Sequence, residues 1–61
     1  MKLQAARDLA KLQSGNFKLI MHVVADEQFG YVAATPKDMA TRYADIEQDD
    51  ILFVYCYGKE Y

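Results

Sequence analysis

The chain contains a run of seven apolar or aromatic residues, Ile51–Tyr57, that no charged residue interrupts. Residues of this kind favour extended backbone, and a short polar connector, residues 47–50, precedes the run, so we predict a strand. Successive side chains of a strand point to opposite faces of its sheet, and here both alternating sets are apolar. Both faces of this strand therefore need cover.

Cover is scarce in a chain of 61 residues, which forms one α+β domain, residues 1–61. Such a chain buries only ~60% of its unfolded surface, and small domains often depend on a disulfide, a metal or a partner chain. The single Cys56 forms no internal disulfide, and Cys56 with the single His22 does not complete a four-ligand zinc site. We therefore expect no metal and no cofactor, and stabilisation by another chain.

The composition indicates a globular protein, because 52% of the residues are hydrophobic and 26% are charged. No apolar run approaches the ~20 residues of a membrane span. Charged residues at Arg7, Asp8 and Lys11 interrupt the N-terminal segment, which therefore lacks the apolar centre of a signal peptide. We expect no membrane interaction and a cytoplasmic, reducing location.

The negative charges gather in the second part of the chain, whose net charge as a whole is −2. The acidic residues there are Asp38, Asp45, Glu47, Asp49, Asp50 and Glu60, against only Arg42 and Lys59. The basic excess that phosphate binding requires is absent. This acidic half is suited to a basic surface on a partner protein, which includes sites where it would imitate nucleic-acid phosphates.

Two helices are predicted. Apolar residues at helical spacing indicate the first over residues 3–13, and Ser14-Gly15-Asn16 is predicted to end it, with Gly15 in the left-handed conformation. The second is predicted from Pro36 to about Ile46, because Thr35 can cap it, Pro36 suits the first helical position and Asp38 favours its positive end. Its predicted buried residues are Met39, Ala40, Tyr43 and Ile46.

Residues 17–24 and 29–34 are predicted to form a hairpin around the polar turn at residues 25–28. With the final strand, the element order is α-β-β-α-β and the sheet has three strands. The sheet orders 1-2-3 and 2-1-3 are both compatible with this sequence of elements. We favour 2-1-3, with the last strand antiparallel to the first, because the first strand is apolar on both faces. We place both helices on one face, since two helices cannot easily cover both.

The exposed face and edge of the last strand predict a protein-binding surface, because a long apolar edge strand invites pairing. Tyrosine suits such a surface, since its ring can be buried while its hydroxyl stays hydrated. The candidate partner-binding residues are Tyr31, Phe53, Tyr55, Tyr57 and Tyr61, with the acidic Asp45, Glu47, Asp49 and Asp50.

Other chemistries have weaker support. His22 and Cys56 would form a nucleophilic pair only if their strands were adjacent, and no oxyanion-hole motif accompanies them. The acidic residues 45–50 lack the glycine and the distal glutamate of a calcium loop. Aromatic residues on a sheet face can stack single-stranded nucleic acid, and this is our alternative function. Those residues are Phe17, Phe29, Tyr31, Phe53, Tyr55 and Tyr57.

We therefore interpret the chain as a non-enzymatic protein–protein interaction module. Its expected partner is a second copy of itself, in a homodimer, or a larger host protein to which it would dock as an inhibitor or adaptor. Small acidic proteins of that second kind are typical of phages and other mobile elements, which is an association with size and not a deduction from residues.

Overall fold

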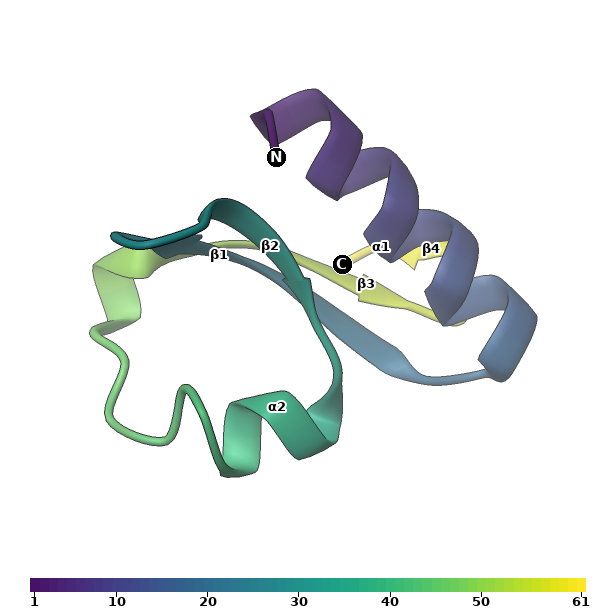
Figure 1. The fold of residues 1–61 in the computed structure, drawn as a ribbon. Coiled ribbons are helices and arrows are strands. Elements are labelled where there is room, and N and C mark those ends of the chain that lie inside the picture. The colour runs from purple at the N-terminus through teal and green to yellow at the C-terminus, as the bar shows by residue number, and fades with distance from the viewer.

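A central strand, β1 (Ile20–Asp26), organises the fold in the computed structural model, which describes all residues, 1–61. It pairs antiparallel with β2 (Gly30–Ala34) on one side and with β3 (Ile51–Cys56) on the other. A short β4 (Lys59–Glu60) adds to β3, which gives the sheet order β2-β1-β3-β4 (Figure 1). The predicted α+β class and the order 2-1-3 are confirmed, and the sheet has one more strand than we expected.

The fourth strand exists because the chain reverses at Tyr57-Gly58. These two residues have φ values of 52° and 88°, and two successive positive φ angles are the pattern of a tight type I′ hairpin turn. The predicted last strand, Ile51–Tyr57, therefore ends one residue earlier, at Cys56. Two residues carry no periodic signal, so β4 could not be predicted from the sequence.

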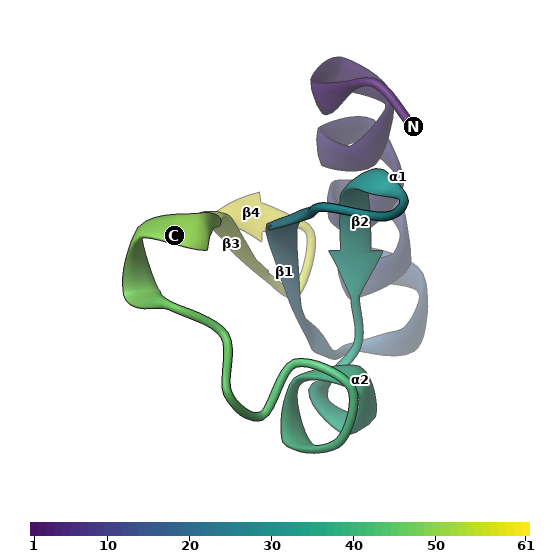
Figure 2. The same cartoon turned by 60° about the vertical axis from the view of Figure 1, so that its left-hand side comes forward.

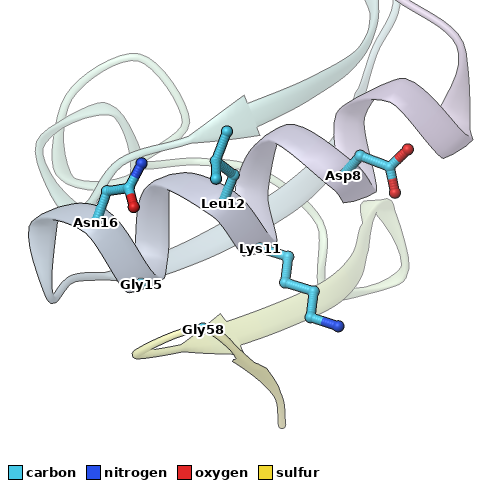
Figure 3. A pocket seen from close by; sticks show the side chains of 6 residues that line it. All are labelled: Asp8, Lys11, Leu12, Gly15, Asn16 and Gly58. Atoms are coloured by element: carbon cyan, nitrogen blue, oxygen red, sulfur yellow. The ribbon is translucent and has the colours of Figure 1, made fainter.

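Helix α1 (Leu3–Phe17) continues through the segment that we expected to end it. Gly15 lies against Gly58 of the β3–β4 turn, where a Cβ on either glycine would stand 3.4 Å from the Cα of the other (Figure 3). The Gly58 N–H also donates to the Ser14 Oγ at 2.9 Å. Gly15 thus allows close packing, and the left-handed residue after the helix is Lys18, with φ of 54°.

Helix α1 covers one face of the sheet. Ala6 and Ala10 on the helix and Met21, Val23 and Tyr55 on the strands form one buried cluster. The small alanine side chains let the helix approach the strands closely. The other alternating residues of β1 face away from α1 and need separate cover.

The opposite face is covered by α2 (Pro36–Ala40) and the turns that follow it. The predicted capping box is present: the Thr35 side chain accepts from the Asp38 N–H and the Asp38 carboxylate accepts from the Thr35 N–H. The helix ends at Ala40, before the predicted Ile46. Tyr43 and Ile46 still pack on this face beside Val24, so turns make the contacts expected of a helix. Packing overrides helix propensity, which is small per residue.

Our placement of both helices on one face is wrong, because α1 and α2 lie on opposite sides of the sheet (Figures 1 and 2). Both faces of β1 carry apolar residues, and each attracts its own covering element. A 3-10 turn, η1 (Gln48–Asp50), then leads the chain into β3.

We predict that Gly58→Ala lowers the free energy of unfolding by about 1–2 kcal/mol more than Gly15→Ala. The steric surroundings of the two glycines are matched, since each added Cβ meets the other glycine at 3.4 Å. Only Gly58 requires positive φ, whereas alanine at Gly15 gains helix propensity. Urea denaturation of both variants measures the difference, and equal losses would contradict this account of the turn.

Candidate functional site

The face that carries α2 is covered over only part of its length. The cross-strand pairs Ile20–Cys56 and His22–Val54 lie on this face, because Met21, Val23 and Tyr55 between them face α1, and none of these four residues belongs to the cluster that α2 covers. Ile20 is 43% exposed, and the other three side chains are partly buried. We call Ile20, His22, Val54 and Cys56 the open half-face.

Within the open half-face, His22 and Cys56 are diagonal neighbours on adjacent strands, so the structure brings together the two residues whose proximity the sequence left open. No hydrogen bond joins them, and the His22 Nδ1 is buried without a partner. Burial lowers the pKa of His22 below its ordinary value of 6.5. The imidazole therefore stays neutral near pH 7, and this part of the sheet carries no charge of its own.

Tyr57 follows Cys56 in the sequence, and its N–H donates to the Leu19 carbonyl oxygen at 3.4 Å. The side chain is 63% exposed although the backbone has φ of 52°. A left-handed conformation costs a non-glycine residue roughly 1–2 kcal/mol, and asparagine or glycine normally occupies this turn position. An exposed aromatic ring at a strained position is not explained by the fold itself.

The other predicted aromatic residues are less accessible. Tyr55 is 2% exposed in the α1 cluster, and Tyr31 and Phe53 pack against the same cluster. Tyr61 is 93% exposed. Of the five predicted aromatic partner-binding residues, only Tyr57 and Tyr61 present most of their surface to solvent.

The buried Tyr55 holds α1 to the end of the chain. Its hydroxyl accepts a hydrogen bond from the Arg7 Nε at 3.0 Å and donates to the Glu60 Oε1 at 3.0 Å. Arg7 also pairs with Glu60 at 2.8 Å and stacks over the Phe53 ring at 4.1 Å. The hydrogen bonds from Arg7 and Tyr55 lower the pKa of Glu60. This network joins the helix to the C-terminal hairpin, so we interpret it as structural.

The predicted acidic residues lie at the far end of the sheet. Asp45, Glu47 and Asp50 line a shallow hollow with Asp26, Glu27 and one cationic residue, Arg42, and Asp49 is exposed nearby on η1. Asp26 accepts hydrogen bonds from the Tyr43 hydroxyl and from two backbone N–H groups, which lower its pKa. No group of three side chains in the chain is arranged to hold a metal ion. We define Asp26, Glu27, Asp45, Glu47, Asp49 and Asp50 as the acidic end.

Sequence reasoning missed Ile20 and Val54 as surface residues. The signal that could have found them was present, since residues 17–24 are apolar on both alternating faces. What the pattern does not give is how far α2 extends over one of those faces.

Comparisons with protein-family models, with curated proteins and with solved structures find no match to this chain. None of its helices has the length and apolar character needed to span a membrane. Geometry and chemistry therefore carry the functional argument.

We predict that the chain loses stability as the pH falls below about 6.5, the ordinary His22 pKa. The unfolded state takes up a proton there, whereas the folded state, with its lowered pKa, takes it up only at lower pH. The stabilising contribution is thus complete above pH 6.5 and is lost on acidification through the folded pKa. Urea denaturation at fixed protein concentration, between about pH 5 and 8, measures the effect.

The matched variant is His22→Leu, which should flatten the stability profile in this pH range. Asp26 and Glu60 have ordinary values of 3.8 and 4.5, lowered here, so their effects fall at more acidic pH. An unchanged slope in His22→Leu would show that another group is responsible.

Proposed function

We propose that this chain is a non-enzymatic protein-binding module that associates with a second copy of itself through the open half-face. The observation that carries the proposal is the incomplete cover of the α2 face, where Ile20 is 43% exposed beside His22, Val54 and Cys56. Burial of apolar area contributes about 25 cal/mol per Å² to stability. Because a short chain buries little surface by itself, the area buried in a dimer adds proportionally more to its stability than it would for a large protein. The neutral imidazole supports the proposal, because a charged group there would oppose burial.

The sheet edges support association through a face and not through added strands. The Tyr31 N–H donates to the Met1 carbonyl oxygen at 3.2 Å along the outer side of β2. On the other edge, β4 and the Tyr61 N–H pair with β3 from Val54 to Cys56, and Leu52 sits at a bulge without a partner in the ladder. Short, covered or bulged edges discourage strand addition.

The alternative of single-stranded nucleic-acid binding receives no support from this geometry. Stacking of bases requires accessible aromatic rings on one sheet face, whereas Tyr31, Phe53 and Tyr55 pack beneath α1. The three exposed rings of the predicted set lie outside the strands, Phe17 at the end of α1 and Phe29 and Tyr57 in turns. Docking on a larger protein as an inhibitor or adaptor would use the same open half-face, so it is the outcome to be considered if the chain does not self-associate.

We predict that Ile20→Glu weakens self-association at least tenfold, or by about 1.4 kcal/mol, because it places a charge in the apolar interface. Leu12→Glu is the control. Leu12 is 59% exposed on α1, at the other side of the sheet, and the same change there should leave association intact. Sedimentation equilibrium over a concentration series measures both.

Should Ile20→Glu fold poorly, Ile20→Thr keeps a β-branched residue in the strand and still removes apolar area. Circular dichroism establishes that each variant is folded. A wild-type chain that remains monomeric at every concentration would refute self-association, as would equal dimerisation of the Ile20 and Leu12 variants.

We predict opposite effects of Tyr57→Asn on folding and on binding. In the monomeric Ile20→Glu background, asparagine should raise the free energy of unfolding by about 0.5–1 kcal/mol, because it tolerates positive φ. In the wild-type background it should weaken self-association, since it removes the exposed ring. Urea denaturation and sedimentation equilibrium measure the two quantities. A stability gain without weaker association would mean that Tyr57 lies outside the interface.

A further inference from the structure

The face that α2 covers only in part can be completed by the same face of a second copy. We call residues 36–47, comprising α2 and the turns after it, the covering segment. Its residues Met39, Tyr43 and Ile46 pack in the cluster around Val24 and Ala34, which includes no residue of the open half-face. A two-fold axis in the plane of the interface, running across the strands, places the covering segment of each copy over the open half-face of the other. Such an interface is self-complementary and closes with two copies.

The size of the molecule argues that both halves take part. The whole chain exposes 4348 Å² of surface, and a standard interface takes about 800 Å² from each partner, which is roughly a fifth of it. The four residues of the open half-face, three of them partly buried, supply only part of that area. The covering segment can add the missing area, because it exposes Pro36, Ala40 and Ala44, small apolar residues that permit close approach to Ile20.

The charged residues are also divided between the two ends of the sheet. Lys18 and Lys59 flank the open half-face, since Lys18 lies two residues before Ile20 and Lys59 pairs with Cys56. We call them the lysine end. The acidic end lies at the opposite end of β1, a strand of seven residues that spans about 20 Å. An antiparallel arrangement of two copies therefore brings each lysine end towards the acidic end of the other.

From shape, area and charge we infer that the self-association proposed above is an antiparallel, interlocked dimer. The covering segment of each copy occupies the open half-face of the other, and Asp45 and Glu47 face the partner's lysine end. This inference rests on the proposed function and adds to it the second half of the interface. Parallel stacking of the two faces would instead set lysine end against lysine end, which repulsion opposes.

Charge reversal tests the arrangement. One variant carries Lys18→Glu and Lys59→Glu, and the other carries Asp45→Lys and Glu47→Lys. The side chains of these four residues are exposed and make no hydrogen bond or ion pair within the chain. Each variant alone sets like charges against each other at both ends and should dimerise at least tenfold more weakly than wild type. An equimolar mixture restores opposite charges at both ends and should form a one-to-one heterodimer with at least the wild-type affinity.

The control variant carries Lys2→Glu, just before α1, and Lys11→Glu, on α1. It changes the net charge as much as the Lys18 and Lys59 variant does, away from the interface, and should dimerise as wild type does. Sedimentation equilibrium gives the affinities, and native mass spectrometry separates heterodimer from homodimers. A dimeric wild type whose reversed variants dimerise normally, or whose mixture forms no heterodimer, overturns the interlocked arrangement and leaves the proposed function standing. A monomeric wild type overturns both.

Discussion

Everything in this structure depends on the burial of both faces of β1. Met21 and Val23 point to one side and Val24 to the other, and all three are fully buried. A strand with two apolar faces must lie between two covering layers, yet the chain has one long helix, α1, and one short helix, α2, to provide them. The long helix covers its face, whereas the short helix covers only part of the second. The open half-face is the consequence of that unequal division.

The same shortage of chain explains the close contacts around Gly58. Helix α1 packs against the β3–β4 turn through two glycines, and the Arg7–Tyr55–Glu60 network holds the short β4 beneath the helix. These contacts enlarge the cover of the α1 face with few residues. They also fix the position of Tyr57, whose positive φ the type I′ turn requires. Asparagine or glycine would meet that requirement at lower cost, so an exposed tyrosine there is a physical reason to look for a binding role.

The sequence sufficed for features that depend on neighbouring residues. The capping box at Thr35 and Asp38 and the central place of the first strand follow from local patterns, and the sheet order follows from that strand's two apolar faces. The errors concern longer-range packing. Period-two alternation tells which side chains share a face but not which helix covers them, so the two helices were assigned to one face. Gly15 could serve a helix end or a close contact, and only the proximity of Gly58 decides between them. Tyr55 and Tyr57 are equivalent in the alternation, although one is buried and the other is exposed.

The state of the sheet edges and of the α2 face also determines how two copies would meet. An edge that lacks partners leads to open-ended assembly, because each added strand exposes a new edge. Here the edges are short or covered, and the incompletely covered surface is the open half-face, where Ile20 is 43% exposed. A second copy related by a two-fold rotation can cover the open half-face and have its own covered in return. Both surfaces are then used, so no third copy can bind there. Under the proposed function, the incomplete cover of this face would therefore also limit the association to two copies.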